Sequence, residues 1–350
     1  MEDKKVYFVG LDKWRFYAFL LVFWQHTGEF IFEKLNSISI FKEFNFESIQ
    51  FTGGIGVQFF FVLSGFLITF LLLRETENYN KINLGSFYLR RILRIWPLYY
   101  LILFCGVYFL PFVLSSYQFQ GDIFKTFFFL NNIDVHNQTM VTGITWSVAI
   151  EEQFYLIWPI IFILFHKKKK LLIVAMIIAS LSLFYNFSSG INNYFSTIGN
   201  TIYLMIGCIG AIIFNSWKKY FYFLHNKLIK KVVVLTVLVL FLIRLKFPIV
   251  QFLILPLFFT LLIINEILSN SDNKTNIFTK LGKYTYGMYI FHPLIILLVK
   301  IFMDKLSMDY NFIFYYNALL IIVSFALTIV ISIFSYKYFE KPFLKLKSKF

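Results

Sequence analysis

Charged residues and cysteine are both scarce in this 350-residue sequence. Charged residues make up 15% of the chain, and only 18 residues are acidic, whereas about a quarter of an ordinary soluble domain is charged. The two cysteines, Cys105 and Cys208, lie inside apolar segments. A disulfide framework is therefore not expected, and apolar burial disfavours the thiolate that a cysteine nucleophile needs.

Apolar and aromatic residues fill the space that charge leaves. Hydrophobic residues make up 59% of the chain, with 48 Phe and 22 Tyr, and the mean hydropathy is +0.71. The net charge of +15 by itself would suggest a nucleic-acid partner, but the basic residues stand in short blocks between apolar runs. That pattern is typical of cytoplasmic loops of membrane proteins. We expect membrane lipid and no nucleic acid as a partner.

The apolar runs predict an all-α fold, a polytopic membrane bundle of about ten transmembrane helices. We expect one domain over residues 1–350, with a short basic tail from about residue 337. The division between the seventh and eighth spans rests on the Lys246-Phe247-Pro248 turn. The predicted spans cover roughly residues 14–32, 52–73, 95–115, 144–165, 171–187, 197–216, 232–247, 249–268, 284–302 and 311–336.

The distribution of basic residues predicts the orientation in the cell (inner or plasma) membrane. With both termini in the cytoplasm, most of the 33 Lys and Arg residues fall in cytoplasmic segments. The N-terminus has a basic start and an apolar run but no small-residue cleavage site, so we expect a retained first helix. The longest stretches on the opposite face, residues 33–51 and 116–143, are candidates to cap an acceptor site.

The first span carries two ionisable residues, Arg15 and His26. Eleven residues of helix correspond to a rise of about 16 Å and roughly 20° beyond three turns, so both lie on one face. Ionisable side chains inside a bilayer are costly and usually functional. An imidazole exchanges protons near neutral pH, so His26 is a candidate general base or acid. A structural histidine bonded to a neighbouring helix is the alternative.

The second span begins with a glycine-rich run that includes Gly53, Gly56 and Gly65. A phosphate-binding loop would normally follow a strand, and none is predicted here. Small residues allow membrane helices to approach closely, so we expect close helix packing.

Arg91 and Arg94 stand at the predicted cytoplasmic entrance to the third span. Residues three apart share a helix face. Guanidinium groups suit phosphate oxygens, so this pair can bind a phosphorylated donor. Ordinary anchoring at the membrane boundary is the alternative.

The fourth span contains adjacent acidic residues, Glu151 and Glu152, after Trp146 and Ser147. Adjacent positions on a helix diverge by about 100°, so both cannot face one partner. One of the two, left open here, can orient or charge-balance His26 as a carboxylate does in a catalytic triad. Membership of a structural ion pair is the alternative.

The ninth span carries Thr285, Tyr289 and His292 at helical spacing, so they form one stripe. Tyr289 and His292 are candidate substrate-binding residues, together with Trp146 and Ser147. A histidine before a proline can also simply hold a broken helix together. The remaining histidines, His136, His166 and His225, fall in loops and are expected to be solvated. No cluster has convincing metal-ligand spacing, so no metal site is expected.

Together these motifs resemble the acyltransferase-3 family of integral-membrane O-acyltransferases, which modify bacterial envelope sugars. They follow the family's order over nearly the whole chain. Lys13 and Trp14 stand where the family usually has Gly-Leu, and Ala149 where Ser is common. The matching segments are LDKWR at 11–15 followed by His26, GVQFFFVLSGFLIT at 56–69, RILR at 91–94, TWSVAIEEQFYLIWP at 145–159, GKYTYGMYIFHP at 282–293 and YFEKP at 338–342.

The resemblance implies a ten-helix core that uses cytoplasmic acyl-CoA as donor substrate, with no permanently bound cofactor. It implies a carbohydrate or lipid-linked sugar as acceptor. His26 is then essential to transfer, with Arg15 completing its motif, and Arg91 and Arg94 lie at the donor side. Some relatives carry a further C-terminal hydrolase-like domain. The printed chain ends soon after its last apolar segment, so we expect transfer to be completed within the membrane domain.

The leading hypothesis is therefore an enzyme that moves an acyl group, most simply acetyl, from CoA to a glycan hydroxyl. His26 would take the acceptor proton or transiently carry the acyl group. The alternative is a transporter of an anionic or lipid-linked solute, whose path the intramembrane charges would line. Against a transporter, the sequence shows neither inverted repeats nor paired broken helices. A scaffold without an active site would leave the polar spans unexplained.

Overall fold

The computed structural model describes residues 7–35, 52–115, 117–188, 194–244, 246–269, 275–306 and 313–346, with backbone only at 29–35 and 313–314. Every element assigned in these ranges is helical. The long helices are α1 (Val9–Leu35), α3 (Thr52–Tyr79), α4 (Leu84–Phe104), α8 (Trp146–Leu164), α9 (Lys168–Ser188), α10 (Thr197–Ser216), α11 (Lys227–Ile243), α12 (Leu255–Leu268), α14 (Thr285–Lys305) and α15 (Ile313–Ser335).

Short helices connect or extend the long ones. In chain order they are η2 (Cys105–Phe109), α5 (Leu110–Val113), α6 (Ile123–Phe127), η3 (Asn131–Ile133), η4 (Val135–Asn137), α7 (Met140–Gly143), η6 (Lys218–His225), η7 (Val250–Ile254), α13 (Ile277–Gly282), η10 (Tyr336–Glu340) and α16 (Lys341–Leu346). The predicted tail from residue 337 is thus helical as far as residue 346. The region 36–51 of one predicted capping stretch lies outside the described residues.

Each of the ten predicted spans coincides with one of the long helices, which confirms the all-α membrane fold. Eight helical segments in the described ranges are long and apolar enough to cross a membrane. The remaining two predicted spans correspond to α1 and to α11, which has 17 residues. The predicted division between spans seven and eight is also correct, because α11 ends at Ile243 and η7 begins at Val250.

The helix that contains the third span begins eleven residues before the predicted span. We expected it from residue 95, but α4 begins at Leu84, where the Asn83 side chain accepts a hydrogen bond from Ser86 N at 3.0 Å. This N-cap satisfies one of the free N–H groups at the helix start. Consequently Arg91 and Arg94 lie inside a continuous helix instead of at its entrance.

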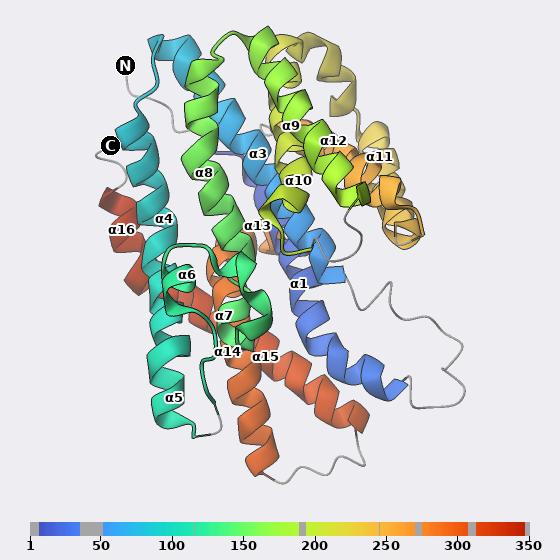
Figure 1. Ribbon diagram of the computed structural model, residues 1–350. Helices are drawn as coiled ribbons and strands as arrows, with labels where there is room; N and C mark the ends of the chain where they lie inside the picture. Colours follow the sequence, from blue (N-terminus) through green and yellow to red (C-terminus); the bar gives the residue numbers. More distant parts are fainter. Residues whose placement is uncertain are drawn as a thin grey trace.

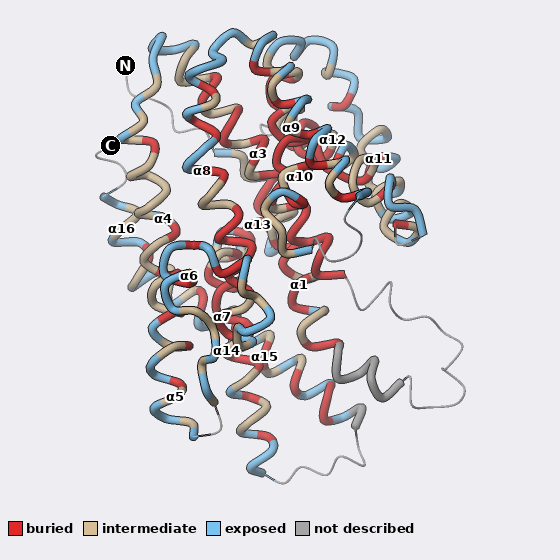
Figure 2. The backbone as a smooth tube through the Cα atoms, viewed as in Figure 1, coloured by how far each residue is buried: buried red, intermediate tan, exposed pale blue. Residues whose placement is uncertain are grey.

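The central helix of the bundle is α3, which packs against α1 and α10 (Figure 1). Buried residues concentrate on α3 and α10, whereas α5 and α11 are largely exposed (Figure 2). The exposed outer residues are themselves apolar, as in Phe184 of α9 at 72% exposure. An apolar outer surface is what a helix in lipid requires.

Glycine allows the central helices to touch, as the sequence predicts. A Cβ on Gly56 would lie 2.3 Å from Ala18 O of α1, and one on Gly65 would lie 2.0 Å from Leu204 O of α10. Neither backbone oxygen can move aside without moving its helix. These contacts bring α1 and α10 against α3 and thereby fix the position of His26 relative to the bundle core.

Lys13 and Trp14, which stand where the resembled family usually has Gly-Leu, have a structural role in this chain. Both contact Glu266 of α12, which is fully buried: Lys13 Nζ lies 2.9 Å and Trp14 Nε1 2.8 Å from Glu266 Oε1. Lys230 of α11 adds a further ion pair at 2.5 Å. This network joins the start of α1 to α11 and α12.

Candidate active site

A cavity of about 250 Å³ lies beside His26, where several helices meet. His26 comes from α1, Trp146 from the start of α8 and Tyr289 from α14, and all three line the cavity. The sequence predicted each of them as a site residue. The structure therefore brings the candidate base together with two of the four candidate substrate-binding residues.

His292 lies directly beside His26. The two ring centroids are 5.2 Å apart, and His292 is fully buried between Phe19 and Tyr289. His292 Nδ1 lies 3.2 Å from Met288 O. A carbonyl only accepts hydrogen bonds, so Nδ1 carries the proton of the neutral ring, and Nε2 keeps its lone pair. Within the described part of the chain, Nε2 is buried without a hydrogen-bond partner.

Ser147 fixes the hydroxyl of Tyr289. Their oxygens are 2.6 Å apart, and the Tyr289 hydroxyl donates to Ile144 O at 3.1 Å. Tyr289 OH then accepts from Ser147. Ser147 is thus a supporting residue that orients Tyr289, and it is not itself among the residues lining the cavity.

The two glutamates contact side chains other than His26, the partner that the sequence predicts for one of them. Glu151 accepts from Ser64 at 2.8 Å and from Tyr155 at 3.0 Å, and Glu152 accepts from Trp96 Nε1 at 3.0 Å. No hydrogen bond joins either carboxylate to His26 among the residues described. The neighbour of the imidazole is instead His292, because α14, and not the acidic turn of α8, faces that part of α1.

Arg91 and Arg94 belong to the same polar region as Glu151. Both positive charges interact electrostatically with the Glu151 carboxylate. The Arg91 guanidinium lies over the rings of Phe87 and Tyr155, at 5.7 and 5.8 Å from their centroids. Its Nε is buried and has no hydrogen-bond partner in the described ranges. An available guanidinium donor is what a phosphate-bearing substrate would require.

Arg15 lies near the start of α1, away from the histidine cavity. Its Nη1 donates to Asp12 Oδ1 at 2.6 Å, and Asp12 also accepts from the Tyr7 hydroxyl. Eleven residues of helix separate it from His26, a rise of about 16 Å. The two residues of the motif therefore occupy different depths of the bundle.

Sequence reasoning did not identify several residues that complete the cavity. Gln25 precedes His26, and its Oε1 is buried without a partner within the described residues. Tyr194 and Phe195 also line the cavity and pack on Trp146, with ring centroids 5.1 Å away in both cases. Gln25 was detectable as a polar residue within an apolar run. The two aromatic residues gave no such signal, because aromatic residues are common throughout this chain.

The segment after α5, residues 117–139, is held together by its own hydrogen bonds and is called the cap below. Asp134 accepts from the backbone N–H of Asp122 at 2.8 Å and from Asn137 at 2.6 Å, and these bonds lower the pKa of its carboxyl. Asp122 accepts from the backbone N–H of Lys125 at 3.1 Å, which likewise lowers the pKa of Asp122. Gln138 and Thr139 of this segment line the His26 cavity. The capping of an acceptor site by residues 116–143 stays a prediction.

Comparison with known proteins agrees with this arrangement. The chain is 37% identical to the peptidoglycan O-acetyltransferase OatA of Listeria monocytogenes over 142 residues, which are 36% of this chain and 22% of the relative. It is 35% identical to the O-acetyltransferase OatA of Staphylococcus aureus over 182 residues, 46% of this chain and 30% of the relative. The putative peptidoglycan O-acetyltransferase YrhL of Bacillus subtilis is 29% identical over 231 residues, 59% of this chain and 33% of the relative.

The alignments cover a third or less of each of these relatives, and no solved structure matches the chain. The acyltransferase-3 model, described as an acyltransferase domain, matches residues 8–337. That range extends from just before α1 to η10 and contains every site residue discussed above. The protein therefore belongs to the acyltransferase-3 family.

Proposed function

We propose that this enzyme transfers an acetyl group from acetyl-CoA to a hydroxyl of a cell-envelope glycan or lipid-linked sugar. The observation that carries the proposal is the pair of imidazoles, His26 and His292, 5.2 Å apart beside a cavity lined by Trp146 and Tyr289. The names of the relatives, peptidoglycan O-acetyltransferases, support a glycan acceptor.

In this proposal His26 is the general base. The acceptor hydroxyl passes its proton to the imidazole as its oxygen bonds to the acetyl carbonyl carbon. The carbon–sulfur bond of the thioester then breaks, and the departing CoA thiolate receives the proton. Atoms and charge balance without any further reactant. A half-buried imidazole at a cavity wall suits this role, because the acceptor can reach it.

In this proposal His292 supports His26 by offering a hydrogen-bond acceptor, a ring nitrogen whose lone pair points in a fixed direction. Its Nδ1 proton is held by Met288 O, so Nε2 is the only ring nitrogen that can accept a hydrogen bond from a hydroxyl or from the neighbouring ring. Tyr289, fixed by Ser147, presents an aromatic surface to the acceptor. Positioning of this kind can supply a large share of an enzyme's rate acceleration.

The donor is proposed to bind through the arginines. Arg91 and Arg94 of α4 would hold CoA phosphates beside the middle of α8, where Arg91 lies over Tyr155, and Arg15 would help to position the donor. Glu151 and Glu152 act as positioning residues, since their contacts with Ser64, Tyr155 and Trp96 hold α3, α4 and α8 together at this depth.

The experiment compares purified His26→Ala, His166→Ala and wild-type protein with acetyl-CoA and a glucosamine-containing oligosaccharide. Loss of a general base typically costs a factor of about 10² to 10⁴ in rate, so we expect His26→Ala to lose O-acetylation by that factor. His166 is an exposed histidine after α8, and its variant should retain the wild-type rate. Acetylated sugar is measured by mass spectrometry and CoA release by a thiol assay.

Acetylated sugar and CoA release together test the base, the acceptor and the donor site separately. Wild-type rates for His26→Ala in a correctly folded sample would overturn the assignment of the base. CoA release without acetylated sugar in the wild type would contradict the glycan acceptor. If the enzyme transfers acetyl from a donor other than acetyl-CoA, and mutation of Arg91 leaves that transfer unchanged, the proposed donor site is contradicted.

A further inference from the structure

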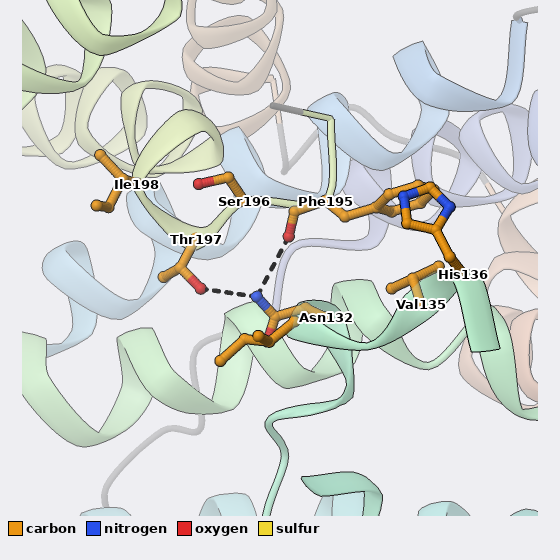
Figure 3. Close-up of a pocket in the computed structure, with 8 residues that line it drawn as sticks. Asn132, Val135, His136, Phe195, Ser196, Thr197 and Ile198 are labelled. Atoms are coloured by element: carbon orange, nitrogen blue, oxygen red, sulfur yellow. Dashed lines mark hydrogen bonds between the residues drawn. The ribbon is translucent and has the colours of Figure 1, made fainter. Parts of the chain in front are cut away.

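A second cavity, of about 380 Å³, adjoins the histidine cavity. It lies between the loop segment that carries η3 and η4 and the start of α10 (Figure 3). Val135 and Phe195 line both cavities, so the two cavities are neighbours. Its volume falls within the range of about 300 to 1,000 Å³ that is usual for small-molecule sites.

The walls of this second cavity are held rigidly by a closed set of hydrogen bonds. Asn132 Nδ2 donates to Phe195 O at 3.2 Å and to Thr197 Oγ1 at 3.0 Å (Figure 3). Gln153 of α8 donates to Asn132 Oδ1 at 2.9 Å and accepts from Thr197 at 2.6 Å. Gln153 directly follows the two glutamates, so the same helical turn supports both the arginine region and this wall.

The lining of the cavity combines apolar surface with polar groups. Phe195 and Ile133 provide apolar surface, and the exposed His136 ring stands against Phe195 with centroids 5.7 Å apart at 87°. Ser196 adds a hydroxyl that accepts from Gly199 N and keeps its own proton for a ligand, whereas the Thr197 hydroxyl donates to Gln153. A sugar ring has C–H groups on its faces and hydroxyls around its edge, so it matches such a lining. A few polar groups among apolar side chains are characteristic of a specific ligand site.

We propose that this second cavity binds a neighbouring sugar unit of an extended glycan while the unit to be acylated occupies the histidine cavity. The inference rests on the proposed glycan acceptor. Because Val135 and Phe195 line both cavities, the two units of a linked pair of sugars would lie on either side of these residues. The enzyme should therefore prefer oligosaccharides over single sugars.

The test compares acceptors of one and four β-linked N-acetylglucosamine units for wild type, His136→Ala, and the double variant His136→Ala/Ile133→Ala. Both side chains are largely exposed, so folding should be unaffected. The loss of one good contact corresponds to about a three- to tenfold change. We expect the ratio of kcat/KM for four units to that for one unit to fall by this factor in His136→Ala, and further in the double variant.

His166→Ala is the matched control, since it removes an exposed histidine elsewhere and should keep the wild-type ratio. Binding of the four-unit sugar, measured by calorimetry without donor, should weaken in the same order. An unchanged ratio and unchanged binding in the double variant would overturn the second sugar site while leaving the acyl transfer intact. A wild-type protein that neither binds nor acetylates any of these sugars would instead contradict the proposed glycan acceptor itself.

Discussion

At the scale of single residues, the two imidazoles of the candidate site differ in burial and in hydrogen bonding. His292 is fully buried, and its Nδ1 is committed to Met288 O. His26 is only half-buried and lines the cavity. In the proposed reaction this difference separates their roles, because the more accessible ring, His26, is the one that would take the proton of the acceptor.

Residue chemistry also predicts a pH dependence of the outer cap. The pKa values of Asp122 and Asp134 are lowered by hydrogen bonds that the folded cap provides. A lowered pKa in the folded state means that the stabilisation is fully present above the ordinary value, about 4, and is lost as pH falls through the lowered value. Hydrogen-exchange protection of residues 122–139, corrected for intrinsic rates, should therefore decrease between pH 5 and pH 2.

The control for this effect is Asp134→Asn, which removes one titrating group and the charge that holds Asp122 N and Asn137. This variant should show weaker protection of the cap at pH 7 and a smaller change on acidification. Protection in the wild type that stays constant down to pH 2 would show that these carboxylates do not stabilise the cap.

At the scale of helices, the approach of α3 to α10 is fixed by backbone contacts. A Cβ on Gly207 would lie 2.1 Å from Val62 O, whereas one on Gly85 of α4 would meet nothing closer than 3.6 Å. Both positions are helical, so propensity alone would favour alanine at each. The difference between them lies in the space available.

We therefore expect Gly207→Ala to lower the free energy of unfolding by about 1 to 3 kcal/mol, the usual cost of overpacking. Gly85→Ala should be neutral or stabilising by up to about 1 kcal/mol, because alanine reduces the entropy of the unfolded chain. Thermal unfolding in one detergent, followed by a thiol-reactive or tryptophan signal, measures both. Equal midpoints for the two variants would contradict the close α3–α10 contact.

At the scale of the whole molecule, the predicted orientation places the arginine region toward the cytoplasm and the cap with both cavities toward the outside. This arrangement follows from the distribution of Lys and Arg. It also matches the proposed reaction, in which a cytoplasmic donor meets an envelope acceptor inside the bundle.

Cysteine labelling in intact cells tests this orientation. In a variant with Cys105 and Cys208 replaced by alanine, Gln118→Cys in the cap should react with a membrane-impermeant maleimide. Lys169→Cys, at the start of α9, should react only after the membrane is permeabilised. Both side chains are exposed, so access depends on the side of the membrane alone. The reverse pattern would invert the proposed topology and with it the direction of transfer.

Much of the architecture was predictable, because a bilayer imposes long apolar helices on the sequence. The helix of the third span begins before the predicted apolar span because α4 continues beyond the apolar run, from the Asn83 cap through Leu84–Phe87 to Arg91 and Arg94. Hydropathy does not register a helix that extends past the lipid. The boundary is instead encoded in Asn83, whose side chain accepts from the backbone N–H of Ser86 and caps the helix.

The sequence by itself determined the membrane helices, the family motifs and the choice of His26, Trp146 and Tyr289 as candidates, which the structure places around one cavity. Spacing along one helix is enough to place side chains on a face. Only the tertiary structure decided that His26 faces His292 instead of Glu151 or Glu152, and that Gln153 holds the wall of a second cavity. Such pairings depend on how α1, α8, α10 and α14 rotate and pack against one another, and no periodicity within one helix specifies that rotation.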